Sequence, residues 1–166
     1  MIRLTLCTLL LSATAATADL AVRFDEGAPK DRFTLTNTGD CALPAMEVTL
    51  NLGTAPAGLI FDVTGAGAGV EVFQPFEMVA GGDALVELPT VLDGDNAVKL
   101  RLRGLAAGAH VAFTVDVDDT AGGREITVSG SEIAGASVQM AMGGGMQSAV
   151  MDATARAMVP VGACTS

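Results

Sequence analysis

The sequence predicts an all-β fold, an antiparallel sandwich of two sheets in a single domain. From Asp19 onward, apolar and polar residues alternate with a period of two, which places successive side chains on opposite faces of a strand. The alternating runs recur about every ten to fifteen residues, and Gly-, Asp- and Asn-rich segments typical of turns separate them. The 3.6-residue spacing of an amphipathic helix is hard to find.

The N-terminal segment 1–18 has the organisation of a secretory signal peptide. Arg3 supplies the positive charge, residues 4–11 form an apolar segment too short to span a bilayer, and small residues precede Asp19 as a signal peptidase requires. We therefore expect a β-sandwich domain over residues 19–166 and a secreted protein, either periplasmic or extracellular. No later segment approaches the length of a membrane span.

Three segments show the alternation most clearly, and each has one apolar and one polar face, as expected of antiparallel strands half exposed to water. They are Glu47–Leu52, Val98–Arg103 and Val111–Asp118. Weaker runs of the same kind are Leu20–Phe24, Phe33–Thr36, Leu59–Thr64, Val70–Phe73, Ala84–Leu88, Glu125–Ser129 and Ser137–Met142.

Two further segments are less regular. Pro75 has no N–H to donate to a strand ladder, so the segment Phe73–Val79 is predicted to be an edge strand or a bulge. Residues 147–158 fit either a last strand or a short helix, and both assignments stay open.

Export would place Cys41 and Cys164 in an oxidising compartment, because Cys7 would leave with the signal peptide. We expect a structural disulfide between these two residues. A redox-active role would need a C-x-x-C motif or a thiolate beside a protonated histidine, and the sequence contains neither.

The charge balance restricts the partners. The chain has 19 acidic and 9 basic side chains and a net charge of −10, which argues against nucleic acids and anionic membrane surfaces. A protein or polysaccharide surface is the remaining class of partner. The sequence also lacks a P-loop, a dinucleotide fingerprint, a zinc spacing and a nucleophile elbow that could use the single histidine, His110. We therefore expect a non-enzymatic protein.

Some segments resemble those of immunoglobulin-like extracellular sandwiches. They are Phe33–Gly39, followed by Met46–Leu52, and Leu105–Val115. The chain has no Trp and no Tyr, so an antibody-type domain, with its buried Trp and corner Tyr, is excluded. The expected fold is thus an antiparallel immunoglobulin-like β-sandwich.

Three runs, Phe24–Phe33, Phe113–Thr120 and Gly123–Gly130, resemble exported bacterial proteins named after the sponge aggregation factor core protein. This resemblance implies an extracellular β-rich module that acts in cell adhesion or matrix association, and calcium as a cofactor.

The acidic residues near the end of one predicted strand are the first candidate site. Asp116 and Asp118 point the same way, about 7 Å apart by the rise of a strand, and Asp119 follows them. Calcium takes six to eight oxygen ligands, so a carboxylate cluster at a strand end suits it. The alternative is a solvated face whose charges pair with a neighbouring strand, for example with Lys99, Arg101 or Arg103.

A second acidic group, Asp93, Asp95 and Asn96, contains an Asp-Gly pair between alternating runs, and this pattern predicts a hairpin turn before it predicts a metal site.

The basic side chains Lys99, Arg101 and Arg103 share the polar face of one predicted strand. They could bind an anionic polysaccharide, but pairing with glutamates such as Glu47, Glu71 or Glu87 across the sheet relieves their mutual repulsion and is the favoured interpretation.

The methionines offer another candidate site. Met140 and Met142, with Met146, Met151 and Met158 behind them, resemble the thioether sites that hold Cu(I) in exported proteins. The alternative is that Met140 and Met142 fill irregular gaps in a core with few aromatic residues.

The leading hypothesis is an exported, non-enzymatic β-sandwich for adhesion, envelope or matrix association, stabilised by calcium at Asp116, Asp118 and Asp119. A periplasmic Cu(I)-binding protein is the alternative, and a hydrolase whose site the sequence does not reveal is third.

Overall fold

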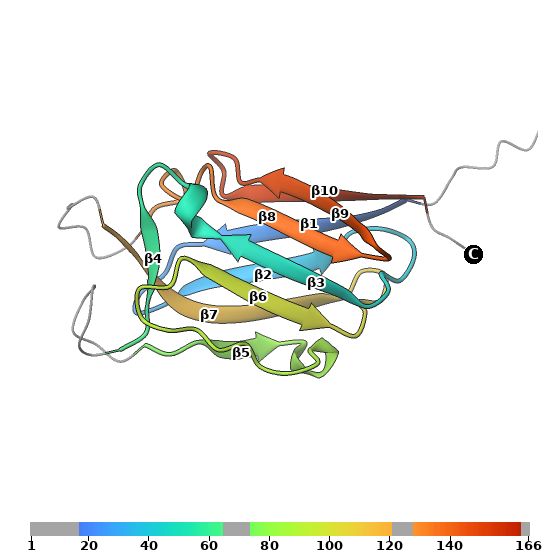
Figure 1. Ribbon diagram of the computed structural model, residues 1–166, viewed down its shortest axis with the longest axis horizontal. Helices are drawn as coiled ribbons and strands as arrows, with labels where there is room; N and C mark the ends of the chain where they lie inside the picture. The colour runs from blue at the N-terminus through green and yellow to red at the C-terminus, as the bar shows by residue number, and fades with distance from the viewer. Residues whose placement is uncertain (1–16, 65–73, 121–127, 164–166) are drawn as a thin grey trace, which may run out of the picture.

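The chain folds into two antiparallel sheets with little helix, which confirms the all-β prediction (Figure 1). The computed structural model describes residues 17–64, 74–120 and 128–163. In these ranges there are ten strands and two 3-10 helices, η1 (Leu52–Thr54) and η2 (Gly82–Ala84). No helix among the described residues has the length and apolar character to cross a membrane.

The larger sheet has six strands in the order β10-β1-β2-β7-β4, and β5 lies beside β7. β7 is the longest strand, and three neighbours pair with it: β2 along one side, and β5 and β4 on successive parts of the other. The bounds are β1 (Thr17–Asp25), β2 (Asp31–Asn37), β4 (Leu59–Asp62), β5 (Glu77–Ala80), β7 (His110–Asp119) and β10 (Arg156–Ala163).

The smaller sheet has four strands in the order β6-β3-β8-β9. Its bounds are β3 (Met46–Asn51), β6 (Ala97–Leu102), β8 (Ser137–Met142) and β9 (Gly145–Val150). The strict alternation of buried and exposed residues along β6 confirms the faces predicted from the sequence, with Val98, Leu100 and Leu102 inside.

The inward faces of both sheets contribute to one hydrophobic cluster. Val, Leu, Ile, Met and Ala supply most of it, but the largest fully buried side chains are Phe33, Phe61 and Phe113. Phe113 stacks between Phe33 and Phe76, with ring centroids 5.2 and 4.7 Å away. An aromatic ladder therefore joins β2, β7 and the segment before β5, although the chain has only six phenylalanines.

The strand predicted over Ala84–Leu88 is wrong. η2 ends at Ala84, and Leu85 makes only an isolated bridge with Leu102. The chain turns at Gly81, which has φ of +66°, and a Cβ there would lie 2.4 Å from the carbonyl oxygen of His110. This close approach to β7 requires glycine and ends β5 before a longer strand can form.

Residues 147–158, for which the sequence left strand and helix as alternatives, form strand and turn and contain no helix. β9 ends at Val150, a turn follows, and β10 begins at Arg156. The described part of the predicted edge segment Phe73–Val79 contains the start of β5, which follows Pro75 and, among the described strands, pairs with β7 alone.

Several predictions lie partly or wholly outside the described residues. These are the strand Val70–Phe73, most of Glu125–Ser129 and the signal peptide 1–18, of which only Thr17 and Ala18 are described, as the start of β1. Cys41 is disulfide-bonded, but Cys164 is outside the described residues, so the Cys41–Cys164 pairing stays a prediction.

Candidate functional site

The pairing of β4 with β7 brings acidic side chains onto one face of the larger sheet. Asp62 lies directly opposite Asp116, and Ile60 lies opposite Asp118. Because paired residues share a face and alternate along each strand, Asp62, Asp116 and Asp118 project to the same side. The intervening residues of these strands, such as Phe61 and Val117, are fully buried in the core and anchor the two strands.

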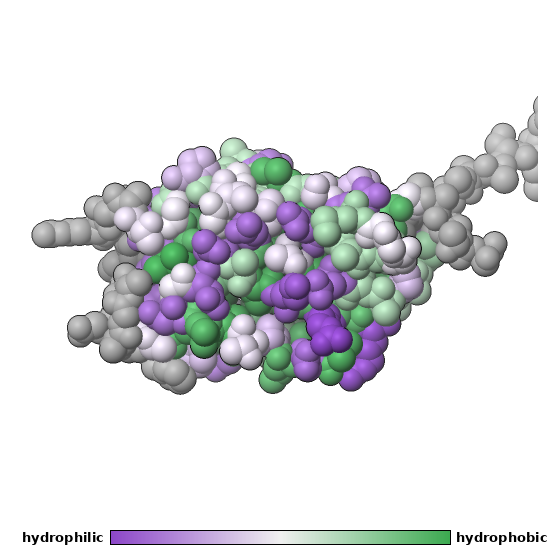
Figure 2. All heavy atoms as spheres, in the orientation of Figure 1, coloured by the Kyte–Doolittle hydropathy of each residue, from purple (hydrophilic) through white to green (hydrophobic). Residues whose placement is uncertain are grey.

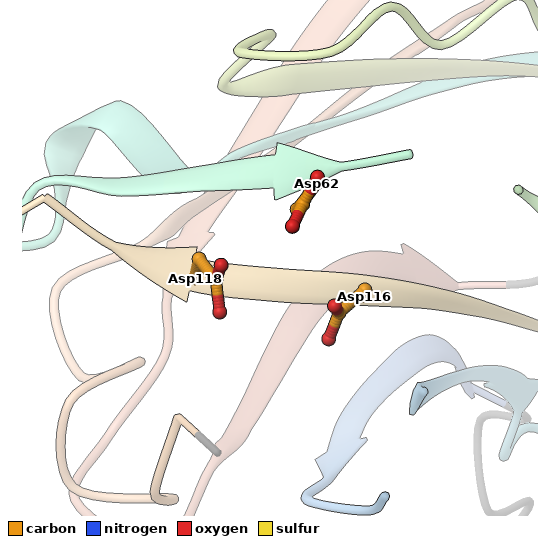
Figure 3. A group of neighbouring side chains, drawn as sticks. All are labelled: Asp62, Asp116 and Asp118. Atoms are coloured by element: carbon orange, nitrogen blue, oxygen red, sulfur yellow. The ribbon is translucent and has the colours of Figure 1, made fainter. Parts of the chain in front are cut away.

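The three carboxylates converge (Figure 3). Oxygen atoms from Asp62, Asp116 and Asp118 all lie within 4.8 Å of one another. Asp62 is 1% exposed and Asp116 is 6% exposed, whereas Asp118 is partly buried. The prediction that Asp116 and Asp118 act together is thus consistent with the geometry, and Asp62 is a third member that the sequence analysis did not identify.

Asp119 does not join this cluster. It lies opposite Leu59, and the alternation of the strand turns it away from Asp116 and Asp118. The basic side chains suggested as partners of these aspartates are engaged elsewhere: Lys99 lies beside Glu47, Arg101 lies beside Glu87, and Arg103 donates to backbone carbonyls.

Burial and repulsion both act on Asp116. Desolvation raises the pKa of this carboxyl from 3.8 to about 7, and the negative charges of Asp118 and Asp62 add to the rise, while a hydrogen bond from the Val117 amide opposes it. Near neutral pH, Asp116 is therefore balanced between its protonated and ionised forms.

A fourth carboxyl, Asp31 at the start of β2, lies close enough to feel the same charges. Its Oδ1 accepts a hydrogen bond from the Gly27 amide at 3.0 Å, and its Oδ2 accepts one from the Val117 amide at 3.1 Å. Burial raises the pKa of Asp31 to about 7; these two hydrogen bonds lower it, and the charges of Asp116 and Asp118 raise it further.

The burial of Asp31 was not predicted, although the sequence contains a signal for it. Asp31 precedes Phe33 and Leu35 by two and four residues, and this spacing places it on their buried face. The two flanking residues, Lys30 and Arg32, are charged, and the strand predicted from the pattern began only at Phe33.

The second acidic group builds a turn beside β4, but the predicted hairpin is wrong, because β5 and β6, the strands before and after this turn, do not pair with each other. Asp95 Oδ2 accepts a hydrogen bond from the Leu92 amide at 2.8 Å, and Asp93 Oδ1 accepts one from the Val63 amide at 3.2 Å. The Phe61 amide donates to the Asp95 carbonyl at 2.7 Å. This turn therefore covers the outer edge of β4 and holds Asp62 in place.

Two basic side chains of β6 form ion pairs with glutamates that were predicted as their partners. Lys99 Nζ lies 2.9 Å from Glu47 Oε1, and Arg101 Nη1 lies 2.8 Å from Glu87 Oε1. Arg103 donates to the backbone carbonyls of Asp83, Leu85 and Val86. The third predicted partner, Glu71, lies outside the described residues.

The methionines are spread over both sheets and the turn after β9, where Met151 lies. Met140 and Met151 are buried in the core and Met142 packs partly buried against it, as the core-filling alternative predicted. Met146 on β9 and Met158 on β10 are 66% and 52% exposed. His110 is exposed at the start of β7.

The carboxylate cluster offers only oxygen ligands, which suit hard divalent cations. Oxygens this close can share a proton or bind a cation, and either relieves the repulsion among ionised groups. Comparison of the chain with protein-family models, curated protein sequences and solved structures gave no match.

Proposed function

We propose that the protein is an exported, non-enzymatic immunoglobulin-like β-sandwich that acts through its surface in adhesion, envelope or matrix association, and that calcium stabilises it. The convergence of Asp62, Asp116 and Asp118 from two strands is the observation that carries the calcium site. The resemblance to the exported bacterial proteins described above supports the adhesive role.

The surface of the smaller sheet also fits a role in contact with other molecules. Hydrophilic and apolar residues are interspersed over the face shown in Figure 2. On the outer face of this sheet, Thr49 lies beside Lys99 and Gln139 on the neighbouring strands. Such a mixed face offers hydrogen-bonding and charged groups to a protein or polysaccharide partner.

The proposed cation would join β4 to β7. β4 is only four residues long, and among the described strands it pairs with β7 alone. A cation held by Asp62 on one strand and by Asp116 and Asp118 on the other would neutralise the repulsion between them. Calcium would therefore stiffen this end of the larger sheet.

We expect the melting temperature to rise with calcium and to return to its starting value with a chelator. Extracellular calcium sites bind at about 0.1 to 1 mM, so 10 mM calcium, about ten times the weaker of these constants, stabilises by about 1.4 kcal/mol. For a domain of this size, that corresponds to a shift of about 3 to 6 °C in thermal unfolding followed by circular dichroism.

The matched variants are Asp62→Asn and Asp119→Asn. Asp62→Asn should abolish the calcium shift and raise the melting temperature of the metal-free protein, because it removes a charge from the cluster. Asp119→Asn changes the same strand pair outside the cluster and should keep the shift. A calcium shift that survives Asp62→Asn, or no shift in the unmodified protein, would exclude this site.

The adhesive role has its own test. The purified protein should sediment with the envelope fraction of its source cells in calcium and should be released by a chelator. Equal recovery in the supernatant under both conditions would exclude a calcium-dependent surface role.

A further inference from the structure

β9 is an edge strand with unusual exposure. It ends the smaller sheet and, among the described strands, pairs only with β8. Five of its six residues are exposed, including Met146 at 66% and Val150 at 61%. Isolated apolar side chains are common on surfaces, but an edge strand also presents unpaired backbone groups to which another strand can bind.

The other sheet edges are protected. Along β6, the Val86 amide donates to the Arg101 carbonyl at 2.7 Å, and the Arg103 amide donates to the Ala84 carbonyl at 2.8 Å. The turn after Leu92 covers β4 as described above. β5 carries Glu77, and β10 carries both Arg156 and Pro160, residue types that discourage pairing of edges.

β9 has none of these protections in its own sequence. Gly145–Val150 contains no charged residue and no proline, within a chain whose net charge is −10. Two copies of an acidic protein repel one another over most of their surfaces, so a neutral strand is where they can approach. A second copy of this chain brings the same neutral strand and is therefore the partner that the charge distribution favours.

β9 runs beside β10 of the larger sheet, and the turn of the hairpin that presents β9 is clear of other atoms. The hairpin turns at Gly143 and Gly144, with φ of +57° and +82°, and a Cβ at either position would meet no atom within 4 Å. In a two-residue hairpin, the pair that closes the turn, here Met142 and Gly145, is hydrogen-bonded. The alternation of the ladder then directs the backbone groups of Met146, Ser148 and Val150 outward.

We propose that two copies of the protein pair through β9, antiparallel, about a two-fold axis at Ser148. A two-fold axis perpendicular to the sheet keeps each side chain on its own face, so only residues separated by an even number of positions can lie opposite one another. In the register centred on Ser148, Met146 of each copy lies opposite Val150 of the other. Met146 and Val150, the two exposed apolar side chains of β9, then cover each other across the interface, once on each side of the axis. The smaller sheets of the two copies become one continuous sheet.

The dimer is expected to be weak. One short strand from each copy buries less than the about 800 Å² per partner of a standard interface, so we expect a dissociation constant on the order of 100 µM. Sedimentation equilibrium over about 10 to 1000 µM protein brackets this value and should show the dimer fraction rising with concentration. A monomer throughout this range would overturn the proposal.

Two lysine substitutions test the surface. Ser148→Lys places like charges opposite each other at the axis and should raise the dissociation constant about fivefold. Gln139→Lys adds the same charge on the same face of the sheet but on β8, where Gln139 lies opposite Ser148 within the hairpin. This variant should change the dissociation constant much less. Equal effects of the two variants would contradict pairing through β9.

Cysteine substitutions test the register. Paired residues in antiparallel strands have Cα atoms within disulfide range, so Ser148→Cys should form a covalent dimer after oxidation with diamide. Gln147→Cys should not, because Gln147 lies opposite itself only in the neighbouring symmetric register. A covalent dimer from Gln147→Cys without one from Ser148→Cys would overturn the proposed axis. The unmodified protein, treated identically, gives the background.

Discussion

Replacing Phe113 with alanine should lower the free energy of unfolding by about 4 kcal/mol, the upper part of the range for large-to-small changes in a core. Phe113 is fully buried at the centre of β7. Its ring stacks on Phe33 at 5.2 Å and on Phe76 at 4.7 Å, so the substitution removes both aromatic contacts and leaves a cavity. The expected fall in melting temperature is about 8 to 16 °C.

Two milder variants separate the cavity from the loss of aromatic stacking. Phe113→Leu keeps most of the buried volume and should cost less than half as much as the alanine variant. Phe76→Ala removes one stacking partner that is only partly buried, so its cost should also be smaller. Urea unfolding followed by circular dichroism measures all three. A Phe113→Ala variant as stable as Phe76→Ala would show that the ladder does not anchor β7.

The effect of Phe113 bears on the site because the same strand carries Asp116 and Asp118. The core side chains of β7 determine which face the aspartates occupy, and its pairing with β4 determines that Asp62 meets them. A variant that weakens this packing without unfolding the protein should therefore also weaken calcium binding. The calcium midpoint measured on Phe113→Leu tests this coupling.

The strands and their faces were predictable where a period-two pattern was long and uninterrupted. β8 matches its predicted bounds, and β3, β6 and β7 match theirs within one or two residues, because one face of each is covered by core and the other is polar. At Ala84–Leu88 the same pattern does not form a strand. The turn at Gly81 and the hydrogen bonds of Arg103 to the neighbouring backbone hold this segment as a covering loop.

The site was only half predictable for a related reason. Asp116 and Asp118 are two residues apart on one strand, so their common direction follows from local geometry alone. Asp62 and Asp31 are distant in sequence, and their positions depend on which strands become neighbours and in which register. A period-two pattern identifies strands but does not determine their order in a sheet, so neither the place of Asp62 in the cluster nor the proximity of Asp31 to it could be predicted.

In the presence of a chelator, the free energy of unfolding should fall by about 3 kcal/mol as the pH rises from 5 to 8. The folded protein raises the pKa of both Asp31 and Asp116 from 3.8 to about 7, in each case chiefly by burial. At a pH between the unfolded pKa of 3.8 and the folded pKa of about 7, the native state holds protons that the unfolded chain has released. The native state therefore gains stability relative to the unfolded chain as the pH falls. The gain is lost as the pH rises through about 7. This fall in the free energy of unfolding is well below the sum that two independent pKa shifts of about three units would give. The reason is that the two groups interact and water still reaches the cluster.

Other carboxyls limit how far the stability rises as the pH falls. Hydrogen bonds from the hydroxyl and amide of Ser129 hold the pKa of Glu132 below its ordinary value, and bonds from Thr154 do the same for Asp152. A group with a lowered pKa contributes stability that is lost as the pH falls through its folded value. Stability in the chelator should therefore pass through a maximum near pH 4 to 5 and decline on either side.

The variants Asp116→Asn and Asp40→Asn isolate the cluster as the source of this dependence. Asp116→Asn removes one of the two titrating groups and part of the repulsion on Asp31, so the fall between pH 5 and 8 should shrink by more than half and the stability at pH 8 should rise. Asp40→Asn removes an exposed charge from a turn and should leave the curve unchanged. Urea unfolding at a series of pH values gives each curve, and a stability that is flat or rising from pH 5 to 8 would contradict the raised pKa values.

Calcium bound at the proposed site should cancel the fall in stability between pH 5 and pH 8. A cation and a proton compete for the same oxygens, so calcium binds more tightly as the carboxyls ionise and its stabilising effect should grow from pH 5 to pH 8. At saturating calcium, the fall in stability seen with the chelator should therefore disappear. A calcium increment of equal size at both pH values would place the binding site away from Asp116, even if the melting temperature responded to calcium.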